Sequence, residues 1–207
     1  MKNGFIRTVS FTAALLFLAG AAEAEVRLWT PTNGIKVRQG LHIEWFRSAA
    51  RDADGNFALV WSDTRSGDRD LWMQLVDSDG AMLWPADGVL VASEVSRQED
   101  PHVMPDGAGN WYVTWVDYRD DIDIEDKGDI YTQKIDSDGV KLWTPETGVA
   151  LCTNSEKQLW VQSFPDGAGG VVSIWVDDRT GQSDIYAQRT DADGNPLWAQ
   201  DGVLVAG

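Results

Sequence analysis

Cysteine is nearly missing from this sequence, and basic side chains are scarce. One cysteine, Cys152, occurs among 207 residues. It cannot form an intramolecular disulfide or supply a zinc or iron–sulfur site built on several cysteines. There are 17 Lys and Arg against 33 Asp and Glu, which gives a net charge of −16. This charge argues against nucleic acid as a partner, because phosphate binding requires clustered positive side chains.

Apolar runs long enough to cross a bilayer are also missing. The longest run, residues 11–22, is shorter than the roughly 20 residues that a transmembrane helix needs. It follows Lys2 and Arg7 and precedes the small-x-small triplet at 22–24, which is typical of a cleaved signal peptide. We therefore expect residues 1–24 to be removed, the mature protein to be secreted (extracellular or periplasmic), and no membrane insertion after cleavage.

What the sequence does contain is one unit repeated three times. Trp84, Trp143 and Trp198 mark the unit, at intervals of 59 and 55 residues. A partial copy at 28–37 places Trp29 another 55 residues upstream. The three full copies are 54–92, 106–152 and 166–206. A period of this length indicates a repeat architecture rather than a single irregular domain.

Each unit has the pattern of antiparallel β-structure. Residues 57–61 alternate in character, and a second apolar strand follows at 71–76 after a polar break, which predicts a hairpin. A D-x-D-G turn, at 77–80 in the first copy, then leads to a strand with a Leu-Trp pair. With one more strand before each unit, four strands form the blade of a β-propeller. The predicted blades are near 40–92, 100–152 and 159–206.

The fold class predicted is therefore all-β and propeller-like, with about three complete four-stranded blades. Residues 28–37 would add an extra N-terminal strand. Closed propellers typically have four to eight blades, so three blades are too few to close a ring. We expect an open arc, and either further blades beyond the C-terminus or self-assembly of two copies to cover the exposed edges.

A W-x-D-x-R motif and a following aspartate recur in the hairpin of every unit. We expect Arg65 and Asp70 to flank a four-residue loop and to form an ion pair across it. Asp63 would then lie opposite Trp72, and the aromatic side chains would fill the space between blades. These repeat residues are interpreted as structural: Trp61, Asp63, Arg65 and Asp70; Trp115, Asp117, Arg119 and Asp129; Trp175, Asp177, Arg179 and Asp184.

The string W-x-D-x-R, followed by D-[IL]-[YW]-x-Q and G-x-x-L-W, resembles the repeat of secreted propeller-like proteins of Gram-negative bacteria. Some of these proteins carry a C-terminal type IX sorting domain; the sequence shows no such domain, so the resemblance does not extend to that export route. The resemblance implies export and a propeller-like fold, with no established activity.

A weaker resemblance is to the Asp-box propellers of sialidases, because Asp79, Gly80 and Trp84 approximate such a box. In sialidases three arginines bind a carboxylate, but here each repeat arginine has an aspartate at a fixed offset, which favours a structural role.

The largest difference between the repeats is an acidic insertion at 120–128. Asp121, Asp123 and Glu125 have the spacing of the first half of a calcium loop. The loop lacks the glycine and the closing glutamate of that motif, so a solvated acidic loop is the favoured interpretation and calcium the alternative. No other cofactor is indicated.

Three tryptophans, Trp45, Trp111 and Trp160, lie outside the repeat positions and are the expected exposed contacts for a ligand. The favoured function is an exported, non-catalytic binding or scaffold module for a glycan or a protein. The alternative is a glycan-acting, sialidase-like hydrolase. Hydrolysis of a glycosidic bond requires a pair of carboxyl groups, and no such pair stands out in the sequence. The sequence therefore leaves open whether the protein is an enzyme, and it favours the non-catalytic interpretation.

Overall fold

The computed structural model describes residues 36–37, 44–121 and 126–207. The predicted signal peptide lies outside these ranges, as does all but the last two residues of the predicted strand at 28–37. Within the described ranges, no helix has the length and apolar character needed to span a bilayer. The strands are β1 (Glu44–Arg51), β2 (Phe57–Asp63), β3 (Asp70–Val76), β4 (Val89–Ala92), β5 (Gln98–Pro105), β6 (Trp111–Asp117), β7 (Asp129–Ile135), β8 (Val149–Cys152), β9 (Gln158–Pro165), β10 (Val171–Asp177), β11 (Asp184–Arg189) and β12 (Val203–Ala206).

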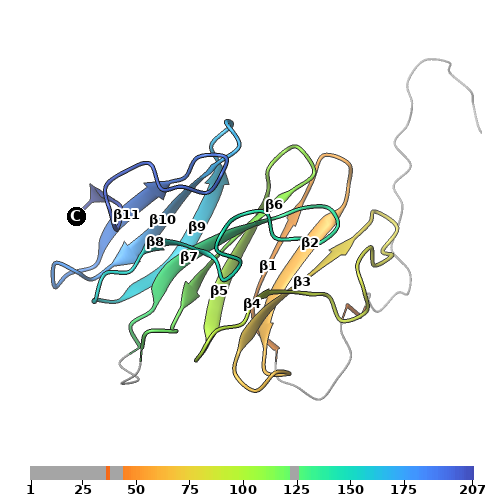
Figure 1. Ribbon diagram of the computed structural model, residues 1–207, viewed down its shortest axis with the longest axis horizontal. Coiled ribbons are helices and arrows are strands. Elements are labelled where there is room, and N and C mark those ends of the chain that lie inside the picture. The colour runs from red at the N-terminus through yellow and green to blue at the C-terminus, as the bar shows by residue number, and fades with distance from the viewer. Residues whose placement is uncertain (1–35, 38–43, 122–125) are drawn as a thin grey trace, which may run out of the picture.

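These strands form three separate four-stranded antiparallel sheets. We name them blade 1 (β1–β4), blade 2 (β5–β8) and blade 3 (β9–β12), and in each the strands follow one another in sequence order. The blades stand side by side in an open row, from orange to blue in Figure 1, with blade 1 and blade 3 at opposite ends. The predicted propeller-like fold with three blades in an open arc is confirmed.

The register of the central hairpins differs from the prediction. Asp63 pairs with Asp70, and Trp61 pairs with Trp72, so the loop covers residues 64–69. Arg65 turns back onto Asp63, with 2.6 Å between Nη2 and Oδ2. The predicted Arg65–Asp70 ion pair is therefore wrong, and so are Arg119–Asp129 and Arg179–Asp184, because Arg119 binds Asp117 and Arg179 binds Asp177. An aspartate two residues away is reached by both the backbone and the side chain of the arginine, whereas the aspartate across the loop is not.

Each blade consequently contains what we name a Trp-Asp-Arg unit, formed by Trp61, Asp63 and Arg65 in blade 1. The Asp63 carboxylate is fully buried and accepts hydrogen bonds from Trp61 Nε1 (2.8 Å), the backbone N–H of Arg65 (3.0 Å) and the guanidinium. Burial alone would raise the pKa of Asp63, but the bonds from Arg65 and Trp61 lower it overall. The guanidinium lies 3.8 Å above the ring of Trp72 and donates to the carbonyl of Asp87, so the unit links β2, β3 and the segment before β4.

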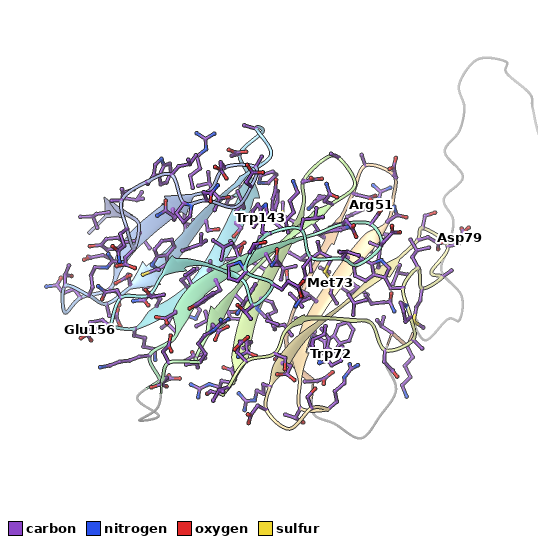
Figure 2. All side chains as sticks on the ribbon, viewed as in Figure 1. Arg51, Trp72, Met73, Asp79, Trp143 and Glu156 are labelled. Atoms are coloured by element: carbon purple, nitrogen blue, oxygen red, sulfur yellow. The ribbon has the colours of Figure 1, made fainter. Side chains whose placement is uncertain are left out.

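The hydrophobic core lies in the seams between blades. Trp84 of blade 1 donates from Nε1 to the carbonyl of Ser137 in blade 2, at 2.8 Å. Trp143 of blade 2, labelled in Figure 2, donates in the same way to Ala192 of blade 3. Their exposed fractions are 6% and 3%, whereas the third repeat tryptophan, Trp198, is 39% exposed. Because the repeat tryptophans are in register, the sequence predicts a core position for each of them. This prediction is wrong for Trp198, since among the described residues no blade follows blade 3.

The hairpin of blade 2 holds a buried carboxyl group whose ionisation opposes folding. Burial, together with the charges of Asp120 and Asp117, raises the pKa of Asp129 to about 7. Folded Asp129 therefore keeps its proton between pH 4 and 7 while the unfolded chain releases it, so its contribution to stability is complete below about pH 4 and is lost as the pH rises through 7.

We expect Asp129→Asn to raise the free energy of unfolding at pH 8 by about 1–2 kcal/mol relative to the wild type, and by much less at pH 4.5. Urea unfolding at the two pH values measures the difference. Asp138→Asn, which changes the same charge in the exposed D-x-D-G turn of blade 2, is the matched control. An Asp129→Asn gain that is equal at both pH values would contradict the role of ionisation.

Candidate functional site on the inner strands

The first strands of the blades, β1, β5 and β9, contact one another across the seams and are named the inner strands. Each of them breaks register with its neighbour at the same place, between Trp45 and Arg47, between Glu99 and His102, and between Leu159 and Gln162. A β-bulge of this kind adds a residue to one strand and redirects its side chain, and bulges are common next to active sites.

Two bulge residues, Asp100 and Trp160, have left-handed backbone conformations, with φ of 48° and 54°. This region is uncommon for residues other than glycine, and such strain is concentrated at functional sites. The two residues occupy equivalent positions on neighbouring blades, and the Asp100 carboxyl accepts a hydrogen bond from the backbone N–H of Trp160. The bulges therefore join the Asp100 carboxyl to the backbone of Trp160 at the seam between blades 2 and 3.

Trp160 presents its indole to solvent, with 69% of the residue exposed, whereas Val161 and Ser163 beside it are buried. Phe164, further along β9, is 47% exposed. Exposed aromatic rings bury apolar surface when a ligand stacks on them. The expectation of an exposed contact is correct for Trp160. It is wrong for Trp111, which is 1% exposed because it packs in the seam between blades 1 and 2, and the side chain of Trp45 lies outside the described part of the chain.

Asp100 has the electrostatic environment of a proton donor. Burial raises its pKa, and the hydrogen bond from Trp160 offsets part of that rise. The nearby Tyr118 is 4% exposed, and burial raises its pKa, with further increases from the charges of Asp126 and Asp100. Among the residues described, no ion pair to Asp100 occurs. A carboxyl group that is half-buried and lacks a cationic partner has a pKa above the ordinary range of an aspartate.

The other carboxylates of this seam are held in ion pairs. Asp126 accepts from Arg97 Nη2 at 2.5 Å and from Lys157 Nζ at 2.7 Å. The bond from Lys157 lowers the pKa of Asp126 against the opposing effect of burial, and Arg97 also lowers it. Glu99 binds Arg69 and Arg97. Asp100 and Asp126 both lie near Tyr118. The pKa of Asp100 is raised and that of Asp126 is lowered.

His102 lies two residues after Asp100 and connects the two inner strands. Its Nδ1 accepts the backbone N–H of Ser163 at 3.2 Å, and its ring centre lies 6.4 Å from that of Phe164. Burial lowers the pKa of His102, so the ring is neutral at physiological pH. Its role is to hold β5 against β9.

The predicted calcium ligands are only partly covered by the structure. Asp123 and Glu125 lie outside the described residues, so the calcium site stays a prediction. Asp121 Oδ2 accepts the backbone N–H of Asp126 at 3.0 Å. Within the described ranges, no group of three His, Cys, Asp or Glu side chains is placed to hold a metal ion.

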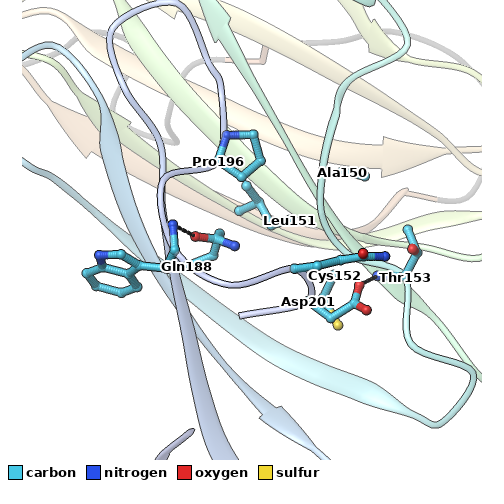
Figure 3. A pocket seen from close by; sticks show the side chains of 9 residues that line it. Ala150, Leu151, Cys152, Thr153, Gln188, Pro196 and Asp201 are labelled. Atoms are coloured by element: carbon cyan, nitrogen blue, oxygen red, sulfur yellow. Dashed lines mark hydrogen bonds between the residues drawn. The ribbon is translucent and has the colours of Figure 1, made fainter. Parts of the chain in front are cut away.

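A groove of about 380 Å³ lies between β8 and the segment before β12. Figure 3 shows its lining, where Asp201 accepts the backbone N–H of Thr153 at 2.9 Å and so joins blade 3 to blade 2. Cys152 also lines the groove, and burial raises the pKa of its thiol to about 12. A thiol that stays protonated is a poor nucleophile, so this groove holds packing and blade-to-blade contacts rather than reactive groups.

No protein-family model and no curated protein matches the sequence. The similar solved structures include an endo-arabinase from Bacteroides thetaiotaomicron, with 17% identity over 79% of this chain and 62% of that one, and a TM-score of 0.49. A thermostable family-43 glycoside hydrolase shares 13% identity over 79% and 54% of the two chains, with a TM-score of 0.47. An α-L-arabinofuranosidase from Podospora anserina, in complex with cellotriose, shares 11% identity over 87% and 54%, with a TM-score of 0.38. This chain therefore spans less than two thirds of the length of each of them.

The favoured expectation of a non-catalytic binding or scaffold module is corrected by this finding. The similar structures are glycan-cleaving enzymes, which agrees with the alternative, a glycan-acting hydrolase. At these identities and TM-scores the likeness concerns the fold alone. The activity of this chain is therefore argued from its own side chains.

Proposed function

We propose that this protein is a glycan-acting hydrolase whose site lies at the inner-strand seam of blades 2 and 3. The observation that supports this most directly is the juxtaposition of Asp100 and Trp160 at two matching bulges. The half-buried carboxyl of Asp100 has a raised pKa, and the indole beside it is 69% exposed.

The chemistry of glycoside hydrolysis assigns a role to each group. A protonated carboxyl donates its proton to the glycosidic oxygen as that oxygen's bond to the anomeric carbon breaks. An ionised carboxylate either takes a proton from the water that bonds to this carbon, or bonds to the carbon itself and is then displaced by water. Environments that separate the pKa values of two carboxyl groups produce such a pair. In this chain Asp100 is the proposed proton donor, Asp126 the proposed ionised carboxylate, and Trp160 the surface on which a sugar ring stacks.

The location of Asp126 supports this assignment. It belongs to the 120–128 insertion, which blades 1 and 3 lack, so the scaffold itself does not require it. Lys157 and Arg97 hold its carboxylate in the ionised form and connect the insertion to the inner-strand seam. A glycan is thus the proposed ligand, and the resemblance to secreted repeat proteins and the segment 1–24 support the further proposal that the enzyme is exported.

Hydrolysis assays on purified mature protein test the proposal. The panel includes chromogenic arabinofuranosides, xylosides and sialosides, together with release of reducing sugar from arabinan and xylan. We expect hydrolysis of at least one substrate class, and a loss of kcat of about 10²-fold or more in Asp100→Asn, because that variant cannot donate the proton. Trp160→Ala should act mainly on KM, because it removes a stacking surface.

Asp138→Asn, in an exposed turn of blade 2, is the control and should leave kcat and KM unchanged. Wild-type protein that hydrolyses nothing in the panel, or an Asp100→Asn variant with full activity, would contradict the proposed function.

A further inference from the structure

Blades 1 and 3 expose opposite faces. In β6 of the middle blade all seven residues are buried. In β10 of blade 3 the buried residues alternate with partly exposed ones, which are Val172, Ile174 and Val176. In β2 of blade 1 the partly exposed residues are Phe57 and Leu59, which belong to the other face of the hairpin. We name the face of a blade that packs on the next blade in the sequence its back face, and the opposite one its front face.

Residues at equivalent positions of the three blades differ in exposure, and those on the back face of blade 3 are uncovered. Trp84 and Trp143 are 6% and 3% exposed within their seams, whereas Trp198 is 39% exposed. Val91 and Leu151 are 0% and 2% exposed, and the corresponding Val205 is 60% exposed. The same apolar positions are thus covered in two blades and uncovered in the third, which marks an interaction surface.

Three hydrogen bonds recur in both seams and define what that surface binds. In each, the repeat tryptophan donates from Nε1 to a carbonyl of the D-x-D-G turn in the next blade. The backbone N–H of the first inner-strand residue, Gln98 or Gln158, donates to a loop carbonyl of the preceding blade, at 2.8 and 3.2 Å. A side chain of the preceding inner strand also accepts a backbone N–H: Ser48 from Val103, and His102 from Ser163, at 3.3 and 3.2 Å.

Both halves of a further seam are present in this chain. In each seam the preceding blade supplies the repeat tryptophan, a hairpin-loop carbonyl and an inner-strand side chain. Blade 3 has all three, namely Trp198, the loop before Asp184 and the exposed Gln162. Blade 1 has the D-x-D-G turn at 77–80 and an inner strand that starts at Glu44, paired with Asp63 as Gln98 is with Asp117. These are the elements of the following side.

We propose that the back face of blade 3 binds the front face of blade 1 in a second copy of this chain. Two copies of three blades joined at both ends give a ring of six blades, which is within the usual range of four to eight. Such a ring leaves neither apolar face exposed, and one symmetry operation generates both new seams. The large negative charge of each copy, −16 for the full sequence, opposes association, so the dimer should become tighter as salt screens that charge.

Sedimentation velocity of the mature protein over a concentration series tests the proposal. We expect a monomer–dimer equilibrium that shifts toward the dimer at higher salt. Val205→Glu, on the back face of blade 3, should weaken dimerisation by about 30-fold or more, because it places a charge in a desolvated seam. Since Val205 is already exposed in the single chain, this variant should fold normally.

The matched control is Leu197→Glu in the same blade. Leu83, Leu142 and Leu197 are 49%, 47% and 49% exposed, so this position stays outside the seams even where a blade follows. Leu197→Glu should therefore dimerise like the wild type. Leu59→Glu, on the front face of blade 1, should lose dimerisation as Val205→Glu does.

Mixing the two defective variants distinguishes a seam between blade 3 of one copy and blade 1 of the other from a contact between identical faces. The Leu59→Glu copy retains an intact back face and the Val205→Glu copy an intact front face, so a mixture should associate through one intact seam although neither variant does so alone. Three results would overturn the proposal. The first is a wild-type protein that stays monomeric at every concentration and salt level, as it would if another segment of the same chain covered the face. The others are equal effects of Val205→Glu and Leu197→Glu on dimerisation, and a mixture of the two defective variants that stays monomeric.

Discussion

Gly88→Ala should lower the free energy of unfolding by about 2–5 kcal/mol. Gly88 has a φ of 82°, in the left-handed region, and a Cβ added there would lie 2.4 Å from the carbonyl oxygen of Met73 and 3.0 Å from the ring of Trp61. The left-handed conformation costs about 1–2 kcal/mol for a residue with a Cβ, and forcing an atom into a packed site adds about 1–3 kcal/mol. The backbone atom cannot move without separating β3 from the segment before β4.

The destabilisation by Gly88→Ala should extend to the Trp-Asp-Arg unit, because that unit is bonded to the residue before Gly88. The carbonyl of the preceding residue, Asp87, accepts a bond from Arg65 in the Trp-Asp-Arg unit at 2.8 Å. The equivalent glycine of blade 2, Gly148, has the same problem, since its Cβ would lie 2.5 Å from the ring of Trp115. Moving this segment therefore loosens the ion pair and the ring packing together.

Gly181→Ala is the matched control for Gly88→Ala. Its φ is 84°, but a Cβ there would meet nothing within 4 Å. It should destabilise by only about 1–2 kcal/mol, the cost of the backbone conformation. Urea unfolding with unchanged m-values provides the comparison. If the two variants lose the same free energy, the close approach at Gly88 is not what fixes this turn.

Asp177→Ala should destabilise the protein by about 3–5 kcal/mol, because it removes one member of a buried ion pair and leaves the other uncompensated. Asp177 is fully buried and accepts bonds from Trp175 Nε1, the backbone of Arg179 and its guanidinium. Burial opposes the charge, yet these bonds lower the pKa of Asp177 overall. After substitution the guanidinium retains the ring of Tyr186 and the carbonyl of Asp201, which do not neutralise it.

Asp178→Ala is the control for Asp177→Ala, because it removes the same charge from the adjacent residue. The carboxylate of Asp178 accepts one bond, from Ser183 Oγ, at an exposed position, and its loss should cost less than about 1 kcal/mol. Thermal or urea unfolding of both variants measures the difference. Similar losses would show that the Trp-Asp-Arg unit does not stabilise the hairpin.

The sequence allows the blades to be predicted because their signals are local and repeated. Alternating strands, D-x-D-G turns and the recurrence of Trp84, Trp143 and Trp198 depend on short-range geometry. The partner of Arg65 could not be predicted from spacing, because aspartates lie on both sides of the arginine and only the backbone path of the loop decides between them. The exposure of Trp198 depends on whether another blade packs against blade 3, and a repeat pattern does not record such a contact.

The site at Asp100 and Trp160 could not be predicted, because a β-bulge interrupts the alternation of side chains by which a strand is recognised in a sequence. Asp100 lies where Trp160 stands in the next inner strand, and this replacement of an aromatic residue by a carboxyl group is the signal that the sequence offered. Asp126 falls within the 120–128 insertion, which the sequence favours as a solvated acidic loop. Its pairing with Lys157 joins residues far apart in the sequence and becomes visible only in the folded chain.

The pH dependence of kcat/KM for a hydrolysed glycan, in the wild type and in Asp100→Asn, tests the proposed hydrolase most directly. If Asp100 donates the proton, wild-type activity falls on the alkaline side as that carboxyl ionises, at a pH above the ordinary range of aspartate because burial raises its pKa. The variant should lose at least about 10²-fold in activity together with this alkaline limb, whereas Trp160→Ala should keep the limb at the same pH. Full activity in Asp100→Asn, or an alkaline limb that persists in that variant, would contradict the assignment.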